Sequence, residues 1–234
     1  MAAKNVVLIS VDDMIDVSRY RNAFGVDIQT PNIDQLMARG ATFANAFTAT
    51  PICNSARVAM VTGRSPFSTG VHHNNDATID QVVPATETIL GSAHAAGWYT
   101  AARGKLFHGD TFIPAVRAYL EPILDDFDWF GGYRGVNSLP EPVGVAPAAA
   151  PVAEEEFLDA QSAAWSAEFV RSYAATDPFF LSVGITKPHL SWDVPDRFFA
   201  LYDRSRIVLP DDGGLQFEDL PEHFKNALNL GGDW

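Results

Sequence analysis

The stretch NVVLISVDD, residues 5–13, decides the fold of this chain. Its first seven residues, Asn5 to Val11, form a nearly continuous apolar run rich in β-branched side chains. This pattern is typical of a strand buried on both faces of a sheet. A second continuous apolar run, PFFLSVGI, spans residues 178–185. Strands of this kind belong to sheets covered by helices, so we expect an α/β protein.

Helical patterns alternate with the predicted strands. Pro31 and Gly40 mark the start and the end of one predicted helix. Further helices are expected within 54–63, 84–97 and 154–175, and further short strands in 41–47 and 98–105. The alternation predicts a mainly parallel central sheet sandwiched between helices. The Pro- and Ala-rich stretch 139–153 predicts an extended surface loop.

Composition narrows the class of protein. The 234 residues are 47% hydrophobic and 19% charged, as in ordinary globular domains, and no apolar run approaches a membrane span. A formal net charge of -13 argues against nucleic acid or an anionic membrane surface as partner. The single cysteine excludes an intrachain disulfide. We expect a cytoplasmic protein if Met1 is the true start, and a secreted or periplasmic one if a leader was removed.

Polar residues follow three of the predicted strands. In parallel sheets, ligands bind beyond the carboxyl ends of the strands. That rule selects Asp12-Asp13, Gly104-Lys105 and the stretch Lys187–His189 as parts of one candidate site.

Asp12, Asp13 and Cys53 each allow two interpretations. The aspartate pair could bind a hard cation such as Ca²⁺ through its oxygens, or form a solvated turn. Cys53 could be a small buried apolar residue, which is the common role of a lone cysteine. It also precedes a helix start, with Arg57 one turn further on. These features predict a lowered thiol pKa or an oxyanion site.

The basic and aromatic candidates are weaker when taken alone. Lys105 and His108 are three residues apart and Lys187 and His189 two apart, and each couple could be an ordinary surface pair. His72 and His73 are assigned pocket lining at most. The side chains of Trp98 and Trp192 could stack on a sugar or aryl ring, but packing roles are the stronger expectation.

Four segments in this order resemble the N-terminal half of type I sulfatases, members of the alkaline phosphatase superfamily. They are NVVLISVDDM (5–14), the stretch 30–71 with CNSAR inside it, GKLFHG (104–109) and the stretch 177–203 with TKPH inside it. The last two are most similar to the iduronate-2-sulfatase-like branch. The resemblance implies that residues 1–234 are the N-terminal part of a sulfatase catalytic domain, whose C-terminal part is absent from this chain.

The resemblance also implies a chemistry. In this family a maturation enzyme oxidises the cysteine of a C-x-P-x-R or C-x-A-x-R motif to formylglycine, whose hydrate attacks sulfur. Here Cys53 and Arg57 keep that spacing, with Ser55 between them. The family pattern implies a divalent cation, Ca²⁺, held by Asp12, Asp13 and residue 53. The resemblance implies that Arg57 stabilises residue 53. It implies that sulfate oxygens are bound by Lys105, Lys187 and His189. It also implies that His108 positions the nucleophile or takes its proton.

Part of the family's metal site has no counterpart here. Such proteins supply further ligands from a later Asp-His-Gly or Asp-Asn-Gly segment, and neither string occurs in this chain. The nearest string, PDDGG at 210–214, lacks a preceding apolar strand and is not assigned. A second polypeptide could complete the domain.

The expected substrate is a sulfated small molecule or sugar. The alternatives are a phosphonate monoester hydrolase or phosphodiesterase on the same scaffold, and a truncated sulfatase-like domain without catalysis.

Overall fold

The computed structural model describes residues 5–108, 114–128, 148–149, 153–190 and 192–208. They fall into two compact units. The first combines residues 5–14 with the described part of 45–196, and the second combines 15–44 with 197–208. The PDDGG string and most of the stretch 139–153 lie outside the described residues.

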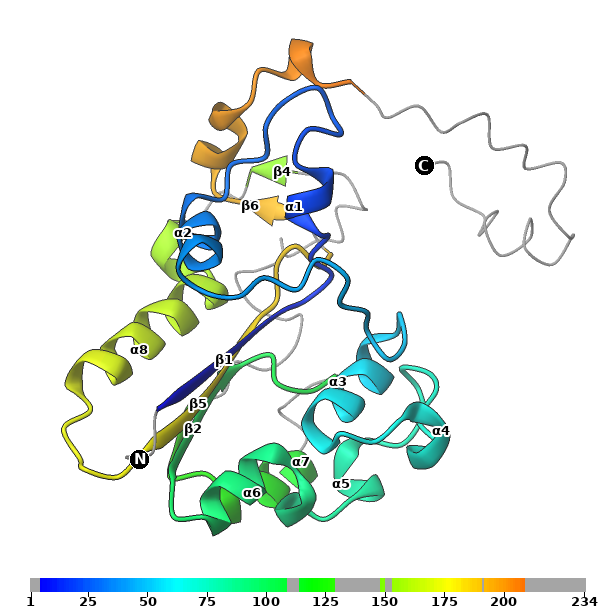
Figure 1. Cartoon of the computed structure of the whole chain (residues 1–234), viewed down its shortest axis with the longest axis vertical. Coiled ribbons are helices and arrows are strands. Elements are labelled where there is room, and N and C mark those ends of the chain that lie inside the picture. The colour runs from blue at the N-terminus through cyan, green and yellow to red at the C-terminus, as the bar shows by residue number, and fades with distance from the viewer. Residues whose placement is uncertain (1–4, 109–113, 129–147, 150–152, 191, 209–234) are drawn as a thin grey trace, which may run out of the picture. The chain divides into compact units, whose positions relative to one another are not determined.

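The first unit is built around a four-stranded sheet in the order β1-β5-β2-β3 (Figure 1). Every neighbouring pair runs parallel, which confirms the predicted sheet. The strands are β1 (Val6–Val11), β2 (Tyr99–Gly104), β3 (Asp126–Asp128) and β5 (Phe179–Ile185). β3 was not predicted, because the short polar sequence DFD carries no strand pattern. A small two-stranded sheet pairs β4 (Ala148–Ala149) with β6 (Asp193–Val194).

Helices cover both faces of the main sheet (Figure 1). One face packs on a large core that includes Phe180 of β5, and the other packs Leu181 and Val183 of β5 against α8 (Leu158–Ser172). Burying each such side chain contributes about 1.5–3 kcal/mol. The remaining helices of this unit are α3 (Cys53–Thr62), α4 (Pro66–Thr69), α5 (Ile79–Val82), η1 (Ala85–Glu87), α6 (Ile89–Ala95), α7 (Pro114–Leu120), η2 (Glu121–Ile123) and η3 (Glu154–Glu156).

Two strand predictions were wrong. β1 is not buried on both faces, since Ile9 is 55% exposed. The reason is position: within the described residues β1 pairs only with β5, so it lies at an edge. The stretch 41–47 forms no strand, and Phe47 is 88% exposed. In the described part of the chain these residues pair with no strand, so propensity alone did not make the stretch β.

The second unit contains α1 (Val17–Tyr20), α2 (Pro31–Arg39), η5 (Arg204–Arg206) and most of η4 (Asp196–Leu201). Arg21 ties its N-terminal segments together by donating to the Ile28 carbonyl at 2.6 Å and to Asp34 at 2.5 Å. The Tyr202 hydroxyl accepts the Gln29 N–H at 3.0 Å. Among the helices that the structure describes, none combines the length and apolar character that crossing a bilayer requires.

Candidate active site

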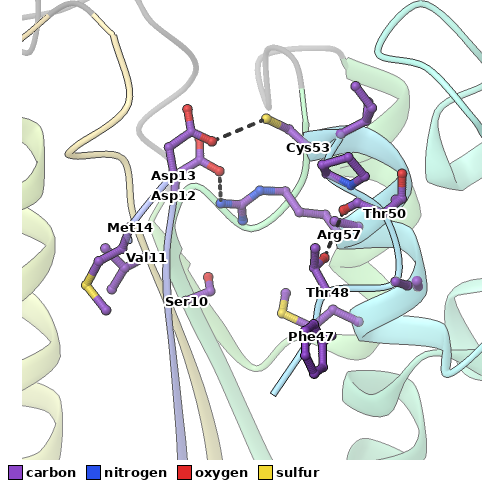
Figure 2. A pocket seen from close by; sticks show the side chains of 16 residues that line it. Ser10, Val11, Asp12, Asp13, Met14, Phe47, Thr48, Thr50, Cys53 and Arg57 are labelled. Carbon is purple, nitrogen blue, oxygen red and sulfur yellow. Dashed lines mark hydrogen bonds and ion pairs between the residues drawn. The ribbon is translucent and has the colours of Figure 1, made fainter. Parts of the chain in front are cut away.

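The candidate site lies where the carboxyl ends of β1, β2 and β5 meet the first turn of α3 (Figure 2). The Asp12 N–H donates to the Ile185 carbonyl at 3.0 Å, and the Lys105 N–H donates to the Gly184 carbonyl at 3.1 Å. The close approach requires glycine at 184, because a Cβ there would overlap the Lys105 backbone. Backbone contacts between strand ends therefore bring together segments that are far apart in the sequence.

Asp12 is the buried centre of the site. Its side chain is only 6% exposed, and its Oδ1 accepts a hydrogen bond from Arg57 at 2.9 Å. Its Oδ2 accepts a hydrogen bond from the Lys105 ammonium. Burial by itself would raise the pKa of Asp12, but the hydrogen bonds and charges of Lys105 and Arg57 hold that pKa below its ordinary value. Asp12 is therefore a carboxylate at neutral pH.

Arg57 links α3 to the end of β2. Besides Asp12, its guanidinium donates to the carbonyls of Lys105 at 2.6 Å and of Leu106 at 3.2 Å. The residue is 6% exposed, so these bonds are made away from water. Arg57 thus holds Asp12 and the Lys105 backbone in a fixed relation. Its described hydrogen bonds go to these groups, and its positive charge acts to lower the pKa of Cys53, which is the direction that its predicted role requires.

Cys53 opens α3, and its Sγ lies 4.0 Å from Asp13 Oδ1 (Figure 2). The expectation of a lowered thiol pKa is wrong. Burial raises the pKa of Cys53, and the negative charges of Asp12 and Asp13 add to this, while Lys105 and Arg57 oppose it. An unmodified thiol at this place stays protonated at neutral pH and is a poor nucleophile.

His189 and Asp13 complete the rim of the site. His189 Nε2 lies 3.8 Å from Asp13 Oδ2. The other ring nitrogen, Nδ1, is 2.7 Å from the Leu190 carbonyl, which can only accept, so we assign the proton of the neutral ring to Nδ1. Asp13 has a φ of 55°, an unusual conformation for a residue other than glycine. This turn directs its carboxylate toward Cys53 and His189.

One group of described residues could hold a metal ion. Ligand atoms of Asp12, Cys53 and His189 all lie within 4.8 Å of one another. A cation about 2.3–2.6 Å from each would fit such a spacing. Asp13 borders the same space through its contacts to Cys53 and His189. The predicted metal residues are therefore brought together by the fold.

His108 belongs to the same electrostatic environment. Burial lowers the pKa of His108, with the positive charges of Lys105 and Arg57 adding to this and Asp12 opposing it. Its Nδ1 is buried and has no hydrogen-bond partner among the described residues. A neutral imidazole in this position could accept a proton.

Lys187 follows β5 and is held through its backbone N–H by Asp159 at 2.8 Å.

The two adjacent histidines and the two tryptophans make contacts that shape or fill the surrounding structure. The backbone N–H groups of His72 and His73 donate to Asp76 at 2.7 and 2.8 Å, which shapes their loop. Trp98 packs against the large core, and the Trp192 indole donates to the Pro188 carbonyl at 2.8 Å. The packing interpretation is confirmed for Trp98. It is wrong for Trp192, whose residue is 42% exposed.

Sequence reasoning missed Asn74. Its Oδ1 accepts the N–H of Asn54 at 3.1 Å, next to Cys53 in the first turn of α3. The Asn54 side chain reaches back to the carbonyls of His73 at 3.2 Å and Ala77 at 3.3 Å. This reciprocal contact fixes the helix start that carries Cys53. The residues after the CNSAR motif give no pattern from which this contact could be predicted.

A pocket of about 560 Å³ opens beside these residues, between the end of β1, the segment before α3 and α3 itself (Figure 2). Its polar end is formed by Asp12, Asp13, Cys53 and Arg57. Apolar side chains, among them Val11 and Met60, line most of the rest, together with Ser10, Thr48 and Thr50. The pocket gives a ligand access to the thiol and to both carboxylates.

Comparison with known proteins places this site in a family context. The sulfatase family model matches residues 4–216. A sulfatase of Formosa agariphila is 29% identical over 237 residues, covering 93% of this chain and 45% of that protein. Human iduronate 2-sulfatase is 29% identical over 234 residues, covering 90% of this chain and 40% of that protein. The chain thus spans less than half the length of these curated relatives.

A solved structure shares the fold at lower sequence identity. The phosphonate monoester hydrolase of Agrobacterium radiobacter matches with a TM-score of 0.62 and 18% identity, covering 87% of this chain and 44% of that one. At this identity the likeness supports a common α/β fold and no shared substrate.

Proposed function

Because this chain belongs to the sulfatase family, we propose that it is the N-terminal part of a catalytic domain that hydrolyses sulfate esters. One observation carries the proposal. Cys53, in the spacing of the family's nucleophile motif, lies 4.0 Å from Asp13 at the end of β1, where the buried carboxylate of Asp12 also lies. The precursor of a nucleophile therefore stands beside a set of ligands for a cation.

Conversion of Cys53 to formylglycine by a separate maturation enzyme is part of this proposal. The raised pKa of the Cys53 thiol supports it, since the unmodified side chain is protonated and unreactive here. When formed, the aldehyde hydrate supplies one hydroxyl that attacks sulfur while the alcohol leaves. Its second hydroxyl then loses a proton, which expels sulfate and restores the aldehyde. The modification also replaces sulfur by oxygen, which suits a hard cation.

A divalent cation, for which we propose Ca²⁺, fits the donor set. Asp12, Asp13 and residue 53 would hold it, and His189 lies within the same group of ligand atoms. Such a cation would polarise the bound sulfate and lower the energy of the negatively charged transition state. Ca²⁺ takes about 6–8 ligands, more than these residues supply, so the proposal includes further ligands from outside the described residues.

The cationic residues have separate roles in this proposal. Lys105, buried beside Asp12, presents positive charge to the sulfate oxygens, where negative charge grows during the reaction. His189, and Lys187 two residues before it, bind the sulfate from the β5 side. Arg57 keeps Asp12 ionised and fixes the Lys105 backbone. His108, whose pKa is lowered, takes a proton from the nucleophile.

We propose a sulfated small molecule or a sulfated sugar as the substrate. The relatives named above are sulfatases, which favours sulfate over phosphonate esters. Hydrolysis of phosphonate monoesters or phosphodiesters stays the alternative chemistry. The non-enzymatic alternative is a domain without catalytic activity that a second polypeptide completes.

Turnover of nitrophenyl sulfate and of a phenyl phosphonate ester, each with added Ca²⁺, tests the proposal. Mass spectrometry of the tryptic peptide 40–57 reports the state of Cys53 in the same preparation. We expect hydrolysis of the sulfate ester, formylglycine in that peptide and no turnover by Cys53→Ala. An active protein that carries only an unmodified thiol contradicts the mechanism. Faster cleavage of the phosphonate supports the alternative chemistry, and a formylglycine-bearing protein inactive on both esters supports the non-catalytic one.

A further inference from the structure

Asp159 makes an unusual pair of contacts at the end of β5. Its Oδ1 accepts the backbone N–H of Thr186 at 2.9 Å, and its Oδ2 accepts the backbone N–H of Lys187 at 2.8 Å. Both oxygens of one carboxylate are thus used by two successive peptide groups. Hydrogen bonds to an ionised acceptor are about twice as strong as neutral ones.

These contacts differ from the usual role of an acidic residue at a helix start. Asp159 lies in the first turn of α8, where a carboxylate normally interacts with the N–H groups and dipole of its own helix. Here its two hydrogen bonds connect α8 to the segment that follows β5. The segment 186–189 is therefore held by hydrogen bonds from α8, and no other residue of α8 is assigned to the candidate site.

The held segment leads directly to His189. The His189 N–H donates to the Thr186 carbonyl at 3.0 Å, which closes a turn whose first two N–H groups are bound by Asp159. The His189 ring is oriented by its Nδ1 contact to the Leu190 carbonyl at 2.7 Å, and its Nε2 lies 3.8 Å from Asp13 Oδ2. A continuous series of contacts thus runs from Asp159 to the ring of His189.

We propose that Asp159 is a positioning residue that sets the place of His189, and with it Lys187, in the site. The proposal rests on the proposed function, because it treats these two residues as ligands of the reacting group. Asp159 acts through the Thr186–Lys187 backbone and touches no substrate. Loss of the carboxylate leaves two N–H groups without their acceptor and lets the turn relax, which moves the His189 ring away from Asp13.

The test compares Asp159→Asn and Asp159→Ala with the matched control Glu168→Gln. Glu168 lies on the same helix, and its carboxylate forms an exposed ion pair with Arg171 at 3.3 Å. In the full chain, kcat and KM for nitrophenyl sulfate and the inhibition constant of inorganic sulfate are measured. Hydrogen–deuterium exchange of the peptide that contains 186–189 reports the turn without any need for activity.

We expect a loss of about 10- to 100-fold in kcat/KM and weaker inhibition by sulfate in both Asp159 variants, because a displacement near 1 Å can cost about 100-fold. Exchange at 186–189 should become faster, whereas Glu168→Gln should match the wild type. A purely structural role would lower the melting temperature and leave KM and sulfate inhibition of the folded fraction unchanged, and that result overturns the proposal. So does an exchange rate at 186–189 equal to that of the wild type.

Asp159→Asn keeps one acceptor oxygen, so it remains informative should Asp159→Ala fail to fold. If the wild type cleaves no sulfate ester, the proposed function fails on its own account. Exchange at 186–189 and calorimetric binding of inorganic sulfate then decide about Asp159: faster exchange with weaker binding in Asp159→Asn supports positioning, and no change in either overturns it.

Discussion

Replacing Arg57 by methionine should destabilise the protein far more than the same replacement of Arg64. Arg57 is the buried partner of Asp12 and also donates to the Lys105 and Leu106 carbonyls. Arg64, just beyond the end of α3, pairs with Glu87 at the surface, where both side chains are about half exposed, at 45% and 46%. The two variants lose the same charge and gain the same side chain, so burial is the main difference between them.

The structure sets the size of the expected effect. Removing one partner of a buried ion pair costs about 3–5 kcal/mol, because the remaining charge stays in a poorly solvated place. Lys105 still contacts Asp12, which favours the lower end of this range. The two carbonyls that lose a donor favour the upper end. An exposed pair contributes about 0–1 kcal/mol. At about 2–4 °C for each kcal/mol in a chain of this size, the Arg57→Met melting temperature should fall by about 6–20 °C.

Urea unfolding followed by tryptophan fluorescence, with a thermal scan in parallel, measures both differences. In a calcium-free buffer, the difference between the two variants reports only the charges of the protein itself. The reasoning is refuted if Arg57→Met and Arg64→Met lower the free energy of unfolding by similar amounts. It is also refuted if Arg57→Met costs less than about 1 kcal/mol, the value expected of a surface pair.

Three further predictions concern the cation site, a close backbone contact and a buried hydroxyl. Asp13→Asn should weaken Ca²⁺ binding about tenfold or more in calorimetry, because site affinity depends on ligand charge, and an unchanged affinity would remove Asp13 from the metal site. Gly184→Ala should lower the free energy of unfolding by about 1–3 kcal/mol in urea titrations, since its Cβ would overlap the Lys105 carbonyl, and a neutral result would contradict that contact. Burial raises the pKa of Tyr119 to about 12, with the negative charge of Asp80 adding to this. The unfolded chain ionises this phenol near pH 10 while the folded chain keeps it neutral, so stability should fall between about pH 10 and pH 12. Tyr119→Phe should reduce that fall in urea titrations at pH 8 and pH 11, and equal losses in both proteins would contradict the assignment.

The sequence predicted most of the elements that carry the site. The apolar runs at 5–11 and 178–185 became β1 and β5, and the residues after them, Asp12 and Lys187, stand at strand ends as expected. Proline and glycine punctuation also located α2. These predictions succeeded because backbone preference and hydrophobic periodicity are properties of one contiguous segment, which the sequence displays directly.

Other features could not be predicted from local patterns. The apolar sequence of β1 suggests burial on both faces, yet its place at an edge of the described sheet leaves Ile9 exposed. β3 has only three residues, and it forms because β2 offers a free side for pairing. The hydrogen bonds of Asp159 depend on where α8 meets the end of β5, and no spacing in the chain encodes that.

By itself, then, the sequence determined the order of strands and helices, the family motif around Cys53 and the residue types that gather at the strand ends. Only the tertiary structure decided how these residues act on one another. Asp12 and Lys105 are 93 positions apart and in contact, so the charges around the thiol arise from separate segments. The pKa of Cys53 is accordingly raised although its local sequence predicts the opposite, because desolvation and Coulomb energy depend on distance in space rather than along the chain.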